Sequence, residues 1–251
     1  YRISYLKGIK MMIDIIAISD EEVYLTNKDK KKFDLLICAG DLSPQYIDYV
    51  MNEFKPSLSL MVHGNHDKKY YKLYEEENNS FSKVYKGAYV LNHGIVNLKK
   101  FIGKDIIVAG FSGALAHGYR PFYFKEKDIN KFKREILFNT IFKGNKYKQI
   151  DIMVTHNPPY IKNTIKKYGQ SHTPSRALGE FYLKTFPKIW IYGHIHPRYD
   201  FQELDFEIKF LNNVSYLINA VPYKLIKYDE EKKEVIEICT YKKISPKTIL
   251  I

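Results

Sequence analysis

The sequence predicts an α/β fold built on a buried, mostly parallel sheet, and three short apolar runs carry this prediction. The runs span residues 13–19, 33–39 and 58–62, and helical or polar segments separate them. Unbroken apolar runs joined by helical connections are typical of parallel strands that are buried on both faces. Each run ends at acidic or amide residues. Because the carboxyl ends of parallel strands gather at one edge of a sheet, we expect these polar residues to lie together.

The rest of the chain continues the α/β pattern. Helical spacing of apolar residues predicts helices over 43–54, 125–142 and 176–186. The first of these opens with Ser43 and Pro44, which suit the N-cap and first helical positions. Residues 68–89 predict a helix followed by a loop, and residues 89–91 and 94–98 predict a hairpin. Further strands are expected at residues 105–110, 150–154, 189–192, 206–210, 215–219, 223–228 and 234–240.

The length and composition favour a single domain. A chain of 251 residues suits one large α/β domain. No linker, repeat or low-complexity segment divides it, so we expect one domain over residues 11–251. Residues 1–10 are expected to be an N-terminal extension, because Met11 or Met12 would be a natural start.

Cysteine content and hydropathy bear on the compartment. The apolar runs are far too short to span a bilayer, so no membrane partner is expected. Cys38 and Cys239 are far apart in sequence and imply no disulfide framework. Free thiols are typical of a reducing compartment, and we expect a cytoplasmic protein.

The net charge of +12 raises the question of a polyanionic partner. Of the 40 basic residues only five are arginine, and the lysines are scattered in pairs along the chain. Base and phosphate recognition favours the arginine fork. Nucleic acid therefore stays an alternative partner that the sequence does not favour.

Residues that bind metals or transfer protons follow five of the predicted strands. They are Asp20 with Glu22, Asp41, Asn65 with His66, His156, and His194 with His196. Residues two apart in extended backbone point the same way, so Asp20 with Glu22, and His194 with His196, can each converge on one point. Carboxylate, amide and imidazole donors together suit Mn²⁺, Fe or Zn²⁺ better than Ca²⁺. The set is too large for one ion and fits two ions bridged by a carboxylate, an arrangement used in phosphoryl transfer.

Five short blocks of the sequence resemble those of the calcineurin-like metallophosphoesterases. In order, they are Ser19-Asp20-x-Glu22, Gly40-Asp41, Gly64-Asn65-His66-Asp67, Thr155-His156-x-Pro158-Pro159 and Gly193-His194-x-His196. The resemblance implies a four-layer αββα sandwich of two mixed sheets flanked by helices. It also implies metal-dependent hydrolysis of a small-molecule phosphate ester, either a monoester or a diester.

The resemblance assigns roles to these residues. It implies that two divalent ions are bound, Mn²⁺ or Fe in the first instance with Zn²⁺ as an alternative. The first ion would be held by Asp20 and His196, the second by Asn65, His156 and His194, and Asp41 would bridge both. A metal-bridging hydroxide would attack phosphorus in line. Asn65 would also hold a phosphoryl oxygen, and His66 would act as general acid for the leaving group.

The chain departs from the family pattern at Glu22, where most members have histidine. We expect Glu22 to be an oxygen ligand of the first ion. The alternative is that it turns outward and leaves the first site weak or empty. Two nearby residues also have alternative interpretations. Asp67 could orient a loop or His66, or it could be an ordinary acidic residue at a helix start. His172 could face the substrate or lie exposed in its loop.

Two other functions compete with the phosphoesterase interpretation. One is a catalytically silent member that binds a phosphate ligand or a protein. The other is a nuclease, which would need a basic groove leading to His66 and binding that depends steeply on salt. Substrate selectivity is expected to reside in the loops at 68–89, 111–124 and 160–175.

Overall fold

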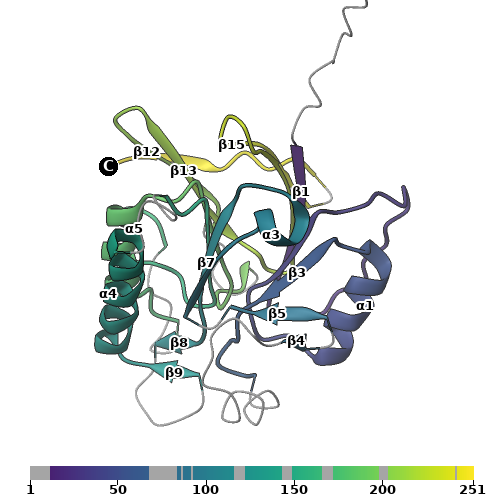
Figure 1. The fold of residues 1–251 in the computed structure, drawn as a ribbon, viewed down its shortest axis with the longest axis horizontal. Helices are drawn as coiled ribbons and strands as arrows, with labels where there is room; N and C mark the ends of the chain where they lie inside the picture. The colour runs from purple at the N-terminus through teal and green to yellow at the C-terminus, as the bar shows by residue number, and fades with distance from the viewer. Residues whose placement is uncertain are drawn as a thin grey trace, which may run out of the picture.

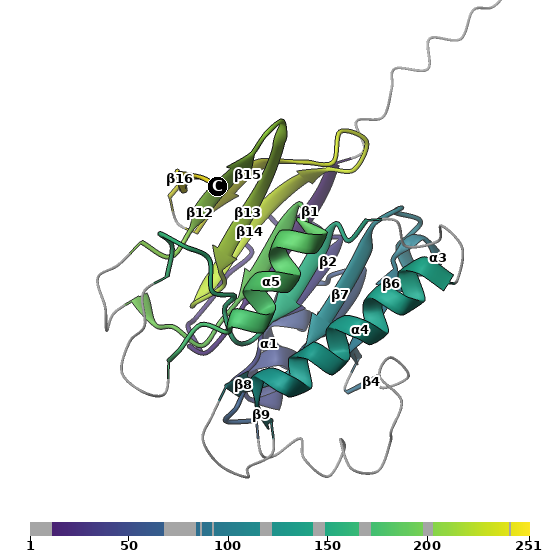
Figure 2. The same cartoon turned by 90° about the vertical axis from the view of Figure 1, so that its left-hand side faces the viewer.

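Two mixed sheets pack face to face and carry helices on their outer faces (Figures 1 and 2). The computed structural model describes residues 12–67, 84–85, 87–91, 93–115, 122–142, 149–165, 172–197, 203–240 and 242–251. The layers follow the order helix, sheet, sheet, helix. The αββα architecture implied by the sequence is therefore confirmed.

The first sheet is parallel at its centre and antiparallel at its edges. Its order is β15-β14-β1-β2-β3-β5-β4. Strands β1, β2, β3 and β5 run parallel, whereas β14 and β15 on one side and β4 on the other are antiparallel to their neighbours. The bounds are β1 (Met12–Ile18), β2 (Leu35–Cys38), β3 (Leu58–Met61), β4 (Val84–Tyr85), β5 (Ala88–Val90), β14 (Tyr223–Asp229) and β15 (Glu234–Cys239).

The second sheet repeats this plan with the order β16-β12-β13-β11-β10-β7-β6. Strands β13, β11, β10 and β7 are parallel, and β12 and β6 flank them in antiparallel pairs. The bounds are β6 (Gly94–Asn97), β7 (Ile107–Phe111), β10 (Ile152–Thr155), β11 (Ile189–Tyr192), β12 (Phe206–Phe210), β13 (Asn213–Asn219) and β16 (Lys247–Leu250). A two-stranded sheet joins β8 (Ala114–Leu115) to β9 (Tyr123–Phe124).

The three helices predicted from the sequence are confirmed as α1 (Pro44–Phe54), α4 (Glu126–Phe142) and α5 (Arg176–Thr185). A short helix, α3 (Lys99–Ile102), lies between β6 and β7. Helix α1 begins as expected, because the Ser43 hydroxyl accepts a hydrogen bond from the amide of Tyr46 at 3.1 Å. Helix α5 is capped by Ser175 and by Glu126 of α4, whose carboxylate accepts hydrogen bonds from the first amides of α5. These contacts fix the two helices to each other at their N-terminal ends.

Three apolar clusters match the spaces between the four layers. The largest lies between the sheets and includes Ile15, Leu60, Val154 and Ile191. A second packs α1 against the first sheet, and a third, rich in aromatic rings, packs α4 and α5 against the second sheet. Because strands such as β2 and β11 are buried on both faces, their sequences are unbroken apolar runs.

The predicted hairpin at residues 89–91 and 94–98 is wrong. β5 belongs to the first sheet and pairs with β3, whereas β6 belongs to the second sheet and pairs with β7. Leu91 and Val96 nevertheless share the core between the sheets, since the chain crosses from one sheet to the other between them. Two adjacent strands that bury one core from opposite sides have the same apolar pattern as a hairpin.

Some expectations stay open. The helix predicted after residue 67 and the extension at residues 1–10 lie outside the described residues, and the domain bounds stay a prediction. Among the described residues, no helix is long and apolar enough to cross a membrane.

Candidate metal centre

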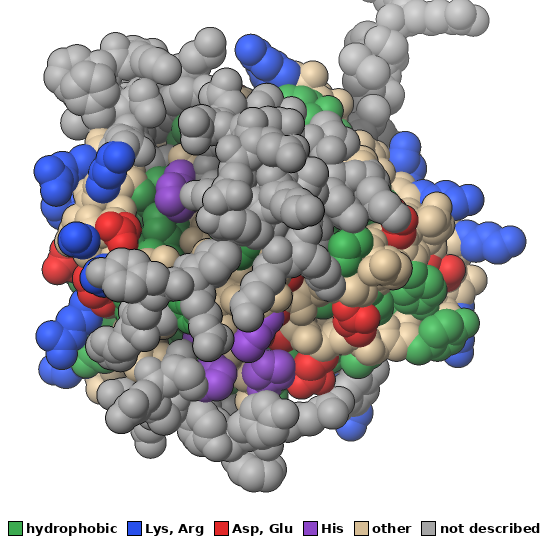
Figure 3. All heavy atoms as spheres, turned by 90° about the horizontal axis from the view of Figure 1, so that it is seen from below, with side chains coloured by type: hydrophobic (Ala, Val, Ile, Leu, Met, Phe, Trp, Pro, Cys, Tyr) green, Lys and Arg blue, Asp and Glu red, His purple; other side chains and the backbone are tan. Residues whose placement is uncertain are grey.

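Residues from both sheets meet where the parallel strands end. Asp20 follows β1, Asp41 follows β2 and Asn65 follows β3, while His156 follows β10 and His194 follows β11. Figure 3 shows histidine side chains beside acidic ones on this face of the molecule. The position agrees with the general tendency of α/β sheets to bind ligands at the carboxyl ends of their strands.

Three of these residues have a left-handed backbone. The φ angles are 60° at Asp20, 55° at Asp41 and 68° at His194. Such angles are uncommon outside glycine, and Asp and His adopt them more readily than most residues. They often occur at functional sites, where the surrounding structure holds them. The extended backbone expected after Asp20 and His194 is therefore wrong, because the chain turns sharply at both.

Close approach of the loops explains the glycines in the blocks. A Cβ atom on Gly64 would lie 2.1 Å from Oδ1 of Asp41, and one on Gly193 would lie 2.0 Å from the Ser19 hydroxyl. A side chain at either position would push an acidic residue out of place. Glycine thus allows the loop after β3 to touch the loop after β2, and the loop after β11 to touch the end of β1.

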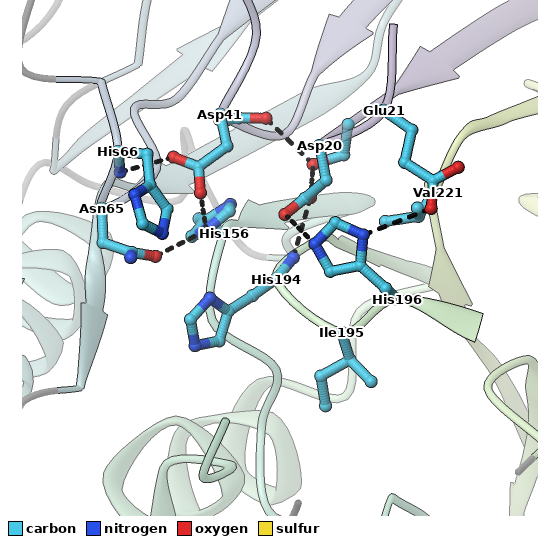
Figure 4. A network of polar contacts seen from close by, with 12 residues as sticks. Asp20, Glu21, Asp41, Asn65, His66, His156, His194, Ile195, His196 and Val221 are labelled. Atoms are coloured by element: carbon cyan, nitrogen blue, oxygen red, sulfur yellow. Dashed lines mark hydrogen bonds and ion pairs between the residues drawn. The ribbon is translucent and has the colours of Figure 1, made fainter. Parts of the chain in front are cut away.

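His156 lies at the centre of the group (Figure 4). Its Nδ1 is 2.8 Å from the carbonyl oxygen of Ala39, which can only accept, so Nδ1 carries a proton. Its Nε2 lies 3.0 Å from Oδ1 of Asn65 and 3.2 Å from Oδ2 of Asp41. The ring of His194 is 4.9 Å from that of His156, measured between centroids. The donors predicted for the second ion and the bridging position are thus neighbours.

The electrostatics of the group favour a cation. Burial raises the pKa of Asp20, and the negative charge of Asp41 adds to this rise, although His156 opposes it. Burial also opposes ionisation of Asp41, but His156 and the amide of His66 bring the pKa of Asp41 down to about 2. Burial would lower the pKa of His156, yet Asp41 and Asp20 raise it to about 10. Two buried carboxylates therefore stabilise positive charge at this point.

The donor set fits a metal ion. One ligand atom from each of Asp20, Asp41 and His156 lies within 4.8 Å of the other two. Carboxylate and imidazole donors, with the amide oxygen of Asn65 beside them, suit Mn²⁺, Fe or Zn²⁺.

Asp20 and His196, predicted for the first ion, are also close. Asp20 Oδ2 accepts hydrogen bonds from the Ser19 hydroxyl at 2.5 Å and from the amide of His194 at 2.9 Å. Its Oδ1 lies 3.5 Å from Nε2 of His196. The side chain of Asp20 is thus fixed by both sheets before any ion binds.

Glu22 lies apart from these donors. It is exposed, and its Oε1 accepts a hydrogen bond of 2.6 Å from the amide of Ser43 at the start of α1. Coordination by Glu22 stays a prediction.

His66 and Asp67 belong to the same block but have different surroundings in the structure. The His66 amide donates to Oδ1 of Asp41 at 2.7 Å, while the residue itself is exposed. Asp67 is buried, and its Oδ2 accepts from the amides of Gly64 at 2.8 Å and Asp41 at 3.0 Å. Of the alternatives for Asp67, the loop-orienting one matches these contacts.

Other residues near the centre were not singled out by the sequence. Oε1 of Glu21 lies 3.2 Å from Nδ1 of His196, and the side-chain nitrogen Nδ2 of Asn65 lies 3.5 Å from the hydroxyl of Tyr123. His172, which the sequence did single out, is half-buried with its ring 4.8 Å from that of His194. Glu21 follows Asp20 in the sequence, but only the backbone turn at Asp20 shows that the Glu21 side chain faces His196. Tyr123 lies in the loop at 111–124, one of those in which substrate selectivity is expected.

Comparison with solved structures supports the fold. TT1561 of Thermus thermophilus superposes with a TM-score of 0.55 at 11% identity, over 92% of this chain and 100% of that chain. A putative 5′-nucleotidase from Staphylococcus aureus gives 0.43 at 11% identity, covering 94% and 54% of the two chains. GAP50 of Plasmodium gives 0.37 at 14% identity, covering 96% and 91%. Comparison with curated protein sequences gives no significant match.

Comparison with family models adds a sequence-level match. The model of the calcineurin-like phosphoesterases matches residues 10–198, a segment that includes the five blocks and the strands that carry them. The match covers well over half of the 251 residues. This chain therefore belongs to the calcineurin-like phosphoesterase family.

Proposed function

We propose that this protein is a dimetal phosphoesterase that hydrolyses a small-molecule phosphate ester. The observation that carries the proposal is the convergence at His156, whose Nε2 lies within 3.2 Å of oxygens from both Asp41 and Asn65. Asp20 and His196 adjoin this group on the other side of Asp41 (Figure 4). Donors from two sheets thus meet in a space suited to two ions that share one carboxylate.

The proposed ligands are those that the family resemblance implies. Asp20 and His196 hold the first ion, Asn65, His156 and His194 hold the second, and Asp41 is shared. Glu22 is retained as a predicted further ligand of the first ion. The bound ions supply Lewis acidity and lower the pKa of the attacking water. Mn²⁺ or Fe suits this donor set, with Zn²⁺ as the alternative.

His66 is proposed as the general acid. Its backbone amide is fixed by Asp41, while the residue is exposed at the surface beside the proposed ligands. An imidazole there can donate a proton to the leaving oxygen of a bound ester. The Asn65 amide is proposed to hold a phosphoryl oxygen, and His172 to contact the substrate from the side of His194.

The cytoplasm is the proposed compartment. Cys38 is buried, Cys239 is half-buried, and both are free thiols. Free cysteines are typical of proteins from reducing compartments.

The test is a screen of phosphomonoesters and phosphodiesters, beginning with p-nitrophenyl phosphate and its bis-ester, with Mn²⁺ added. We expect turnover of one class, loss of turnover on chelation, and about two ions per chain by elemental analysis. Protein that holds two ions and cleaves neither class would contradict the enzymatic proposal and favour a silent member. DNA binding that weakens steeply with salt, together with cleavage, would favour the nuclease.

A further inference from the structure

His196 lies between two carboxylates. Its Nε2 is 3.5 Å from Oδ1 of Asp20, and its Nδ1 is 3.2 Å from Oε1 of Glu21. The side chains are 23% exposed for His196, 17% for Glu21 and 3% for Asp20. Figure 4 shows the imidazole held between the two acids. Both ring nitrogens thus have an anionic neighbour in a partly buried setting.

The turn at Asp20 explains why two adjacent glutamates have different surroundings. The left-handed backbone of Asp20 is followed by a hydrogen bond of 2.6 Å from the amide of Glu21 to the carbonyl of Ser19. After this tight turn Glu21 faces His196, whereas Glu22 faces the amide of Ser43 at the start of α1. The acidic residue directly after Asp20 therefore adjoins the first proposed metal site.

A neutral imidazole has one N–H donor and one lone pair. If Nε2 of His196 gives its lone pair to an ion beside Asp20, Nδ1 must carry the proton and needs an acceptor. The carboxylate of Glu21 is such an acceptor at the observed distance. Carboxylates in this position fix the tautomer and the ring orientation of metal-binding histidines and make them more basic ligands.

We propose that Glu21 is a positioning residue for His196 and sets the affinity of the first metal site. The inference rests on the proposed function, since it assumes that His196 binds an ion. Among the ligands proposed for the first ion, His196 is the one imidazole, because Glu22 replaces the histidine of the family pattern. The orientation of the His196 ring therefore contributes strongly to the affinity of the first metal site.

The test compares Glu21→Gln with Glu22→Gln. Both substitutions remove one negative charge within two residues of Asp20, so a general loss of charge would affect them alike. Zn²⁺ is the probe, because it is diamagnetic and fits the same donors. Calorimetric titration gives the affinities of the sites, and ¹H–¹⁵N spectra of the histidine rings give the tautomer of His196.

We expect wild-type protein to bind two Zn²⁺ ions. In Glu21→Gln one of the two sites should weaken by roughly ten- to hundredfold and the other should change less than twofold. The Nδ1–H signal of His196 should shift or broaden in the same variant. Glu22→Gln should leave the His196 signal unchanged, because Glu22 contacts the amide of Ser43 whereas Glu21 is the carboxylate beside Nδ1 of His196.

Three results would overturn the inference. Two sites of unchanged affinity in Glu21→Gln, or a His196 signal that shifts as much in Glu22→Gln as in Glu21→Gln, would contradict the role of Glu21 while leaving the dimetal proposal intact. Wild-type protein that binds fewer than two ions would contradict the proposed function itself, and the inference with it. Measurement of wild-type stoichiometry first therefore separates the two failures.

Discussion

Asp41 contacts residues from two other sequence blocks. Its Oδ1 accepts from the amide of His66, its Oδ2 faces His156, and its own amide donates to Asp67. A residue with these contacts ties the loops together and also supplies the proposed bridging carboxylate. His66 donates its backbone amide to Asp41 and is exposed, and its imidazole is the group that we propose transfers the proton.

The different contacts of Asp41 and His66 lead to a prediction. Asp41→Asn should lose bound metal and lower turnover by at least roughly 100-fold, because the amide is a weaker shared ligand than the carboxylate. His66→Ala should lower turnover by roughly 10²- to 10⁴-fold, the usual contribution of a general acid, and keep its metal. Elemental analysis and steady-state kinetics on both variants measure these effects. Equal metal loss in the two would refute the role assigned to His66.

At the scale of single residues, the sequence predicts which residues belong to the site better than it predicts which of them touch. The five blocks identified Asp20, Asp41 and His156, which the structure brings within 4.8 Å of one another. The contact between Glu21 and His196 was not foreseen, because it depends on the φ angle of Asp20. A left-handed backbone at a non-glycine residue is set by the surrounding tertiary structure, and no local sequence pattern predicts it.

At the scale of elements, the loops after β2 and β3 are joined by one buried carboxylate. Oδ2 of Asp67 accepts hydrogen bonds from the amides of both Gly64 and Asp41. Burial, with a further contribution from the charge of Asp41, raises the pKa of Asp67 to about 7. The link between the two loops should therefore respond to pH.

The sign of this response follows from linkage. Asp67 titrates near 3.8 when unfolded and near 7 when folded, so its contribution to stability is complete below pH 4 and is lost as the pH rises to 7. Asp67→Asn keeps an acceptor oxygen but does not titrate. With chelator present, the variant should gain stability over wild type from pH 4 to pH 8, by up to about 4 kcal/mol. Denaturant unfolding across this range measures the difference, and a difference independent of pH would contradict the prediction.

The prediction of elements succeeded where local pattern and burial agree. Helix α1 begins at its Ser-Pro signal, and β2 and β11 are unbroken apolar runs because both of their faces are covered. It failed at β5 and β6, which lie in different sheets. Apolar periodicity indicates that a strand faces a core, but it does not indicate which of the two sheets the strand belongs to.

At the scale of the whole molecule, the proposed ligands divide between the two sheets. Asp20, Asp41 and Asn65 follow strands of the first sheet, whereas His156, His194 and His196 follow strands of the second. The sandwich itself was predictable from the family resemblance, because five blocks in order span most of the chain. The loops that would select the substrate lie partly outside the described residues, and their sequences match no motif that would predict their structure.

Because the ligands come from both sheets, metal binding should stabilise the entire sandwich. An ion that binds only the folded state adds about 2.7 kcal/mol per site at 100 times its dissociation constant. For a domain of this size that corresponds to a rise in Tm of roughly 5–10 °C per site. Thermal unfolding of wild-type protein in excess Mn²⁺ and after chelation measures the shift. Asp41→Asn is the control, and its shift should be much smaller, since Asp41 is the ligand proposed for both ions. Equal shifts in the two proteins would mean that Mn²⁺ binds elsewhere, and the absence of any shift in wild type would contradict a metal centre that joins the two sheets.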